Sequence, residues 1–110
     1  NVLAALQSAR GVLPAMRKAG RGTILFTGGG LALSTKAREA SLSMGKAALR
    51  SLALCLAEEL EPEGIHVATL TVRGFVQVGT PFGPELVAER FWELHGEPRE
   101  AWHREAVLMP

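Results

Sequence analysis

The chain has 110 residues, of which 47% are hydrophobic, and this is enough for a single domain with a sizeable core. Twelve basic and eleven acidic residues are mixed along it and leave a net charge of +1, so neither nucleic acid nor a membrane is expected as a partner. It has no charged-then-apolar leader and no apolar run of about 18 residues, which predicts a soluble protein. Cys55 is the single cysteine and is expected to be a small core residue in a reducing, cytoplasmic setting.

A helix is predicted over residues 1–20, because apolar residues recur there at helical spacing. Pro14 is expected to kink this helix, and Gly20 and Gly22 are expected to end it. The next segment, Thr23–Thr27, is a short continuous apolar run, which is typical of a strand covered by helices on both faces. Gly28–Gly30 is expected to end that strand, either as a plain flexible turn or as a turn that binds a ligand.

A long helix is predicted from about Ala40 to Leu60, after a loop over residues 31–38. Its apolar positions and its many Ala and Ser residues allow almost the whole circumference to be buried. A strand rich in β-branched residues follows at Ile65–Val72. Two strands joined by a helix form a right-handed parallel unit, and ligands of such sheets bind at the carboxyl ends of the strands. Those ends are Gly28–Gly30 and Arg73–Thr80.

Beyond the second strand, a loop at Gly74–Pro84 is long enough to cover a site. An amphipathic helix is predicted at Glu85–His95, and a further helix is predicted from Pro98 to Val107. The inward residues of the first of these are expected to be Leu86, Phe91 and Leu94. No metal site is predicted, since none of His66, His95 and His103 has another ligand at metal spacing. The aromatic residues Phe91, Trp92 and Trp102 are expected to anchor a core or an interface.

Several segments, in this order and spacing, resemble the later half of a short-chain dehydrogenase/reductase over Asn1 to about Val76. They are Leu13–Met16, Gly22–Thr27, Lys46–Leu52 and Gly64–Val67. The resemblance implies a Rossmann-like, doubly wound parallel α/β sheet, here helix-strand-helix-strand plus C-terminal helices. It also implies bound NAD or NADP and hydride transfer between the nicotinamide and an alcohol or carbonyl. The family's cofactor fingerprint would precede Asn1, so residues 1–110 are expected to be a single partial domain.

The family's catalytic set is Asn, Ser, Tyr and Lys, and the resemblance assigns it to positions of this chain. Lys46 matches the lysine that binds the nicotinamide ribose, and Asn1 matches the asparagine that holds a proton-relay water. The tyrosine position is Leu42 and the serine position is Gly29, so the usual proton transfer lacks its hydroxyls. Val72–Gly74 replaces the family's Pro-Gly turn, while Thr80 can supply the hydroxyl near the nicotinamide amide.

Ser43 lies within one helical turn of Lys46 and is a candidate for a substitute acid. The alternative is that Ser43 and Lys46, with Glu39 and Arg50, form a polar stripe that faces the cofactor pocket or solvent. Lys46 itself either contacts cofactor or is merely exposed. The predicted catalytic residues are therefore Lys46, Asn1 and Ser43. The predicted cofactor-binding residues are Lys46, Gly28, Gly29, Gly74 and Thr80.

Two functions follow from this pattern. The first is an NAD(P)-dependent oxidoreductase of the short-chain dehydrogenase/reductase type with an atypical active site. The second is a catalytically inactive relative that serves dimerisation or nucleotide sensing. The helix segment Ala47–Leu60 is apolar and rich in small residues, and in the resembled family this helix pairs with its copy, so a homodimer or homotetramer is predicted.

Overall fold

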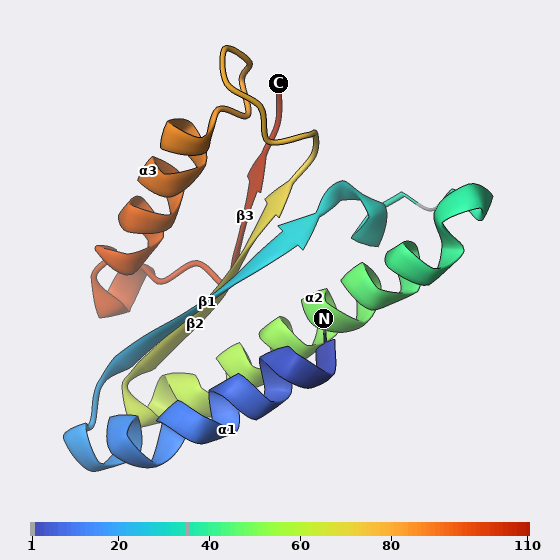
Figure 1. Cartoon of the computed structure of the whole chain (residues 1–110). Helices are drawn as coiled ribbons and strands as arrows, with labels where there is room; N and C mark the ends of the chain where they lie inside the picture. Colours follow the sequence, from blue (N-terminus) through green and yellow to red (C-terminus); the bar gives the residue numbers. More distant parts are fainter. Residues whose placement is uncertain (1, 35) are drawn as a thin grey trace.

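The computed structural model describes residues 2–34 and 36–110, which form a parallel β-sheet with helices on both faces (Figure 1). In this part of the chain the sheet has three strands in the order β1 (Gly22–Gly29), β2 (Ile65–Val72) and β3 (Glu105–Leu108). The helices α1 (Val2–Ala19) and α2 (Ala40–Leu60) lie side by side over one face, and α3 (Pro84–His95) covers the other. This arrangement confirms the predicted Rossmann-like α/β class.

Strands β1 and β2 pair in parallel along their full length, from Gly22 opposite Ile65 to Gly29 opposite Val72. The predicted end of β1 was wrong, because Gly28 and Gly29 belong to the strand and only Gly30 turns away, into a short 3-10 helix at Gly30–Ala32. A Cβ added to Gly28 would lie 3.0 Å from Thr69 Oγ1. The absence of a side chain there lets β1 pack closely on the threonines of β2.

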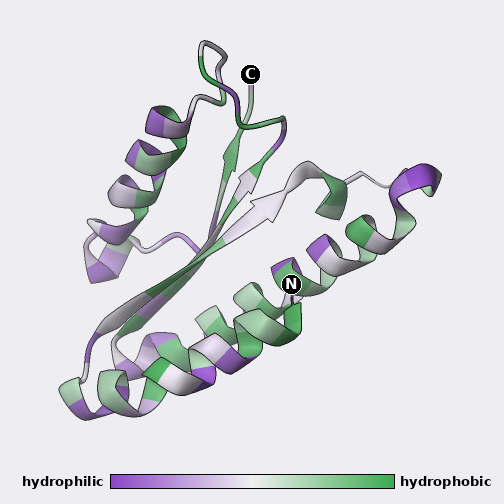
Figure 2. Cartoon of the chain, viewed as in Figure 1, coloured by the Kyte–Doolittle hydropathy of each residue, from purple (hydrophilic) through white to green (hydrophobic). Residues whose placement is uncertain are grey.

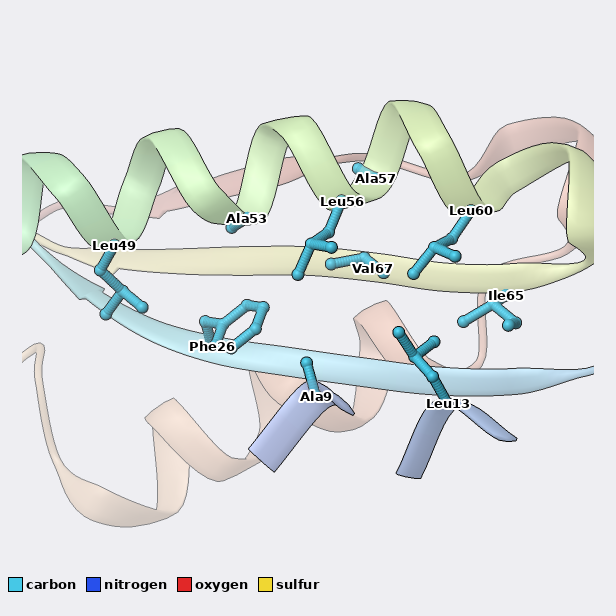
Figure 3. Close-up of a cluster of buried hydrophobic side chains, with 10 residues drawn as sticks. All are labelled: Ala9, Leu13, Phe26, Leu49, Ala53, Leu56, Ala57, Leu60, Ile65 and Val67. Atoms are coloured by element: carbon cyan, nitrogen blue, oxygen red, sulfur yellow. The ribbon is translucent and has the colours of Figure 1, made fainter. Parts of the chain in front are cut away.

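Two hydrophobic clusters hold the layers together, one on each face of the sheet. All eight residues of β2 are buried, and its side chains alternate between the clusters. Figure 2 shows apolar and polar residues interspersed along the helices and apolar stretches in the strands. The cluster beneath α1 and α2 (Figure 3) consists of Ala9, Leu13, Phe26, Leu49, Ala53, Leu56, Ala57, Leu60, Ile65 and Val67.

The predicted helix at Pro98–Val107 was wrong. Only Arg99–Ala101 forms a helical turn, and the chain then extends as β3 beside β2. Backbone hydrogen bonds from Thr69 N to Arg104 O and from Arg73 N to Leu108 O, both 3.0 Å, flank this pairing. Since β2 is buried on both faces, its backbone donors need such partners on both sides.

Two expectations for the helices also need correction. Cys55 is exposed, because it lies on the side of α2 that faces away from the sheet. On α3, Phe91 and Leu94 do pack inward, but Leu86 is exposed and Val87 takes its place against the sheet. A search of the described helices found no segment with the length and hydropathy needed to cross a membrane.

Candidate functional site

A pocket of about 360 Å³ opens at the carboxyl ends of β1 and β2, where parallel sheets bind their ligands. Its walls come from the turn after β1, the segment before α2, the first turns of α2 and the end of β2. The lining residues are Gly29, Gly30, Leu31, Ser34, Lys36, Glu39, Leu42, Lys46, Val72, Arg73, Gly74 and Phe75.

Lys46 reaches this pocket from α2, and its ammonium donates a hydrogen bond to the carbonyl oxygen of Thr27 over 3.3 Å. A Cβ added to Gly29 would lie 3.6 Å from Cδ and Cε of Lys46. Leu42 precedes Lys46 by one helical turn and lines the same pocket. The fold thus brings Gly29, Leu42 and Lys46 together, the positions that the resemblance assigns to serine, tyrosine and lysine.

Ser43 lies elsewhere. Its side chain is 4% exposed and lines an adjoining pocket with Lys36 and Met44, rather than the pocket of Lys46. Its hydroxyl has no hydrogen-bond partner in the part of the chain that the structure describes. The structure therefore gives no contact between the Ser43 hydroxyl and the Lys46 ammonium.

Of the other predicted site residues, some line this pocket and others lie outside it. Gly74 lines the pocket and packs against the ring of Phe82, whereas Gly28 faces β2. The hydroxyl of Thr80 donates to Gln77 O over 2.7 Å and accepts from Phe82 N over 3.1 Å, which holds it inside its own loop. Asn1 lies outside the described residues.

Comparison with known proteins places the chain in a family. The family model described as "short chain dehydrogenase" matches residues 1–87. The chain belongs to the short-chain dehydrogenase family. A search of curated proteins gave no significant match.

Three solved structures that are similar to this chain match almost all of it. A short-chain dehydrogenase from Rhodopseudomonas palustris is 32% identical, with a TM-score of 0.78 over 99% of this chain and 46% of the other. A serine dehydrogenase complexed with NADP+ shares the fold at 21% identity, with a TM-score of 0.86 over 96% of this chain and 51% of the other. A metagenomic short-chain oxidoreductase in complex with NADP is 24% identical, with a TM-score of 0.82 over 97% of this chain and 47% of the other. The chain spans about half the length of these proteins.

The pocket also contains charged residues that were not predicted as site residues. Lys36 comes from the segment before α2, and Arg73 directly follows β2. Phe75, which is 88% exposed, lies at the mouth. The rule that ligands bind beyond the carboxyl ends of parallel strands points to both segments, but a loop has no periodicity from which the direction of a side chain can be predicted.

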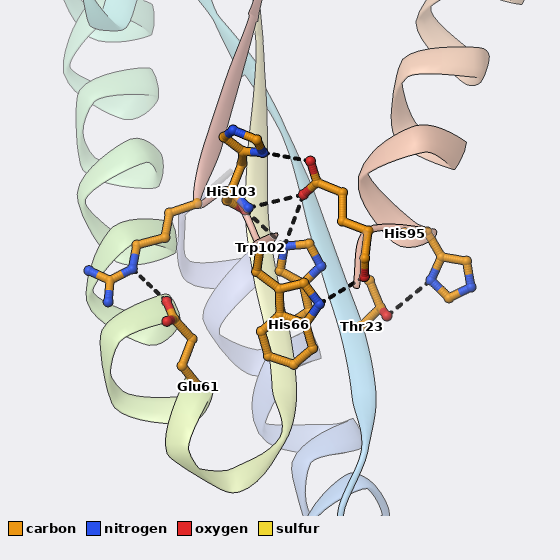
Figure 4. A network of polar contacts seen from close by, with 8 residues as sticks. Thr23, Glu61, His66, His95, Trp102 and His103 are labelled. Carbon is orange, nitrogen blue, oxygen red and sulfur yellow. Dashed lines mark hydrogen bonds and ion pairs between the residues drawn. The ribbon is translucent and has the colours of Figure 1, made fainter. Parts of the chain in front are cut away.

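A second polar cluster lies at the opposite end of the sheet, near the start of β2 (Figure 4). The buried imidazole of His66 stacks on Trp102 and donates from Nε2 to His103 O over 2.8 Å. Glu97 accepts hydrogen bonds from His103 N at 3.0 Å and from His103 Nδ1 at 2.6 Å. Burial raises the pKa of Glu97, but the bonds from His103 outweigh it, so this pKa lies below its ordinary value.

This cluster holds the connection between α3 and β3 in place. It includes the hydrogen bond from Trp102 Nε1 to Glu97 O, which is 3.0 Å long. The described residues contain no group of three or more His, Cys, Asp or Glu that could hold a metal ion. The contacts of Trp102 and His103 with Glu97 and His66 support a structural role for this cluster.

Proposed function

We propose that the chain is part of an NAD- or NADP-dependent oxidoreductase that interconverts an alcohol and a carbonyl compound. The observation that carries this proposal is the position of Lys46 beside Gly29 and Leu42, in a pocket at the carboxyl ends of β1 and β2. Family membership supports it, as do two relatives whose structures contain NADP+ or NADP. The chain spans only about half the length of these relatives, so we propose the activity for the whole protein rather than for this chain alone.

Lys46 and the glycines fit a nicotinamide nucleotide. The Lys46 ammonium has three N–H donors, of which one is directed to Thr27 O, and the others are available for ribose hydroxyls. Gly29 and Gly74 line the pocket with backbone atoms, which offer a nucleotide hydrogen-bonding groups. The bound nucleotide would supply the hydride, while Lys46 would orient its ribose.

We further propose that the active site is atypical. Leu42 has no proton to exchange, and Gly29 has no hydroxyl to polarise a carbonyl. Ser43 does not line the pocket of Lys46, so its proposed use as a substitute acid would need a change of side-chain rotamer or a bridging water. The relay role of Asn1 remains a prediction.

We propose that residues 1–110 form part of one Rossmann-like domain and that this domain forms a homodimer. The outer side of α2 exposes Met44 at 68% and small residues such as Ala47, Ala48 and Ser51. Small and apolar side chains allow two helices to approach closely, which suits pairing with a second copy across a two-fold axis. A tetramer would need a second such surface.

The experiment that tests the cofactor site is a titration of the whole protein, of which this chain is proposed to be part, with NADH and with NADPH, monitored by energy transfer from tryptophan to the nicotinamide. We expect Lys46→Ala to weaken nucleotide binding about tenfold, because hydrogen bonds from a charged donor are lost. Lys18→Ala, at an exposed position near the end of α1, is the matched control and should bind normally. If neither nucleotide binds at millimolar concentration, the proposed function is wrong.

A further inference from the structure

The pocket has an excess of positive charge from three separate segments. Lys36 precedes the 3-10 helix Ala37–Glu39, Lys46 lies on α2 and Arg73 follows β2. The lining residues include one carboxylate, that of Glu39. Three cations against one anion make the local potential positive, although the net charge of the whole chain is only +1.

Arg73 is held firmly at its base. Its backbone N–H donates to Leu108 O over 3.0 Å, which anchors it to β3. Its Cα and Cβ would lie 3.3 and 3.6 Å from a Cβ added to Gly30, so the segments that follow β1 and β2 meet closely at this point. The backbone and the first side-chain carbons of Arg73 are therefore held in place at the pocket.

The guanidinium of Arg73 forms no ion pair with any described residue, and neither does the ammonium of Lys36. Four of the other eight arginines are paired with glutamates. These are Arg17 with Glu63, Arg50 with Glu105, Arg90 with Glu93 and Arg104 with Glu61. The arginine at the pocket is thus free to bind an anion from outside the chain.

We propose that the substrate of this site carries a carboxylate, which Arg73 binds at the pocket rim with help from Lys36. This inference rests on the proposed function, because the reacting carbonyl or alcohol is expected near Lys46. The remaining walls are apolar, from Leu31, Leu42, Val72 and Phe75, and suit a hydrocarbon or aromatic frame. The substrate class is therefore an apolar oxo acid or the corresponding hydroxy acid.

The arrangement of charges explains why Arg73 is the main contact. Glu39 lies three positions after Lys36 and repels a carboxylate on that side of the pocket. No carboxylate of the lining residues lies on the segment of Arg73, which runs from Val72 to Phe75. A guanidinium can also bind a carboxylate through two parallel hydrogen bonds, and apolar surroundings strengthen such a contact.

Benzoylformate and its neutral methyl ester are suitable probes, since they differ only in the charged group. We would measure their affinities by calorimetry, with and without NADPH, for the unmodified protein and for Arg73→Leu. The matched control is Arg38→Leu, which removes the same charge from an exposed residue of Ala37–Glu39 that does not line the pocket. Arg73→Lys keeps the positive charge but removes the planar guanidinium that can donate two parallel hydrogen bonds to a carboxylate.

We expect the unmodified protein to bind benzoylformate about tenfold more tightly than the ester, and Arg73→Leu to abolish this preference. The preference for the acid over the ester should fall to about threefold in Arg73→Lys and should stay at about tenfold in Arg38→Leu. Equal binding of acid and ester, no binding of either, or equal losses in the Arg73→Leu and Arg38→Leu variants would overturn the inference.

The same variants distinguish a substrate carboxylate from the pyrophosphate of the nucleotide. If Arg73→Leu weakens NADPH binding and leaves the preference for acid over ester unchanged, Arg73 serves the nucleotide and the inference is wrong. Failure of the proposed function gives a different result. In that case NADPH does not bind to the unmodified protein, whereas the preference for the acid is still seen without nucleotide.

Discussion

The ammonium of Lys46 lies 3.3 Å from the carbonyl oxygen of Thr27 and ties α2 to the end of β1. This contact places the lysine stem against Gly29, whose backbone is extended at φ −143° and ψ 157°. Any residue can adopt that conformation, and an added Cβ would make ordinary van der Waals contact with Lys46. Position 29 can therefore accept a serine.

The double variant Gly29→Ser with Leu42→Tyr should gain activity in carbonyl reduction. It restores a hydroxyl to polarise the substrate and a phenol one helical turn before Lys46, whose charge favours the phenolate. General acid catalysis contributes about 10²–10⁴-fold, and the measurement is the rate of NADPH oxidation with a ketone. The control is Gly29→Ser with Leu42→Phe, which has the ring but no hydroxyl. Equal rates in the two double variants would show that more than proton transfer is missing.

Glu105 should stabilise the fold in a pH-dependent way. Arg50 donates to its carboxylate over 2.7 and 2.8 Å, and Thr71 donates over 2.8 Å. The bonds from Arg50, aided by Thr71, hold the pKa of Glu105 below its ordinary value of 4.5 in spite of burial. Because the pKa is lower in the folded state, this stabilisation is present above pH 4.5 and is lost as the pH falls through the folded-state pKa.

We expect Glu105→Gln to lower the free energy of unfolding by about 1–3 kcal/mol at pH 7. The difference from the unmodified protein should shrink as the pH falls below 4.5, and urea denaturation at several pH values measures it. Glu100→Gln, on an exposed residue of Arg99–Ala101, is the control and should change little. A difference that stays constant down to pH 2 would contradict the ion-pair explanation.

Trp102 and Trp92 should differ in their importance for stability. The rings of Trp102 and His66 stack with centroids 4.7 Å apart and planes 4° apart, and Trp102 Nε1 donates to Glu97 O. Trp92 is 73% exposed on α3. Replacing Trp102 with Leu should cost about 1–3 kcal/mol, whereas Trp92→Leu should cost less than about 0.5 kcal/mol. Thermal unfolding measures both, and similar losses would argue against a structural role for the stack.

Gly64 should resist substitution by alanine. It adopts φ +80°, and an added Cβ would lie 2.5 Å from the backbone oxygen of Gly20. We expect Gly64→Ala to destabilise the fold by more than about 1 kcal/mol. Gly11, inside α1 with nothing within 4 Å of its Cβ position, is the comparison, and Gly11→Ala should stabilise by up to about 1 kcal/mol. Chemical denaturation gives both values, and the same sign for both would contradict this prediction.

The proposed homodimer should depend on the outer side of α2. Met44→Glu introduces a charge there, and burying it against a second copy is costly. We expect the dissociation constant, measured by analytical ultracentrifugation, to rise by at least about tenfold. Val78→Glu changes a loop residue that is 78% exposed, so it should leave assembly unchanged. If Met44→Glu has no effect on the mass in solution, the two copies meet elsewhere.

Most of the fold could be predicted because its signals are local. The β-branched run of β2 and the helical spacing of α2 each fix an element without knowledge of the rest, and the bounds of β2 were predicted correctly. Strand β3 could not be predicted in this way. It has four residues, follows a proline that suggests a helix start, and is stabilised by pairing with β2, which no local pattern reveals.

The site could be predicted only in part, for a related reason. Spacing along one helix places Lys46 and Leu42 one turn apart, and the strand order brings Gly29 to them. Lys36 and Arg73 come from irregular segments, where the direction of a side chain depends on tertiary contacts. The burial of Ser43 depends on where the turn before α2 meets the helix, which the helical spacing does not determine.

The parallel pairing of β1 with β2 also determines how the chain must fold. The hydrogen bond from Thr69 Oγ1 to Phe26 O joins residues 43 positions apart, with all of α2 between them. Closing so long a loop costs conformational entropy before the contacts between β1 and β2 can stabilise the pair. We therefore expect α2 to form early in folding and the two strands to pair late. Once closed, β2 is covered on every side, and its amides should be the last in the molecule to exchange with deuterium.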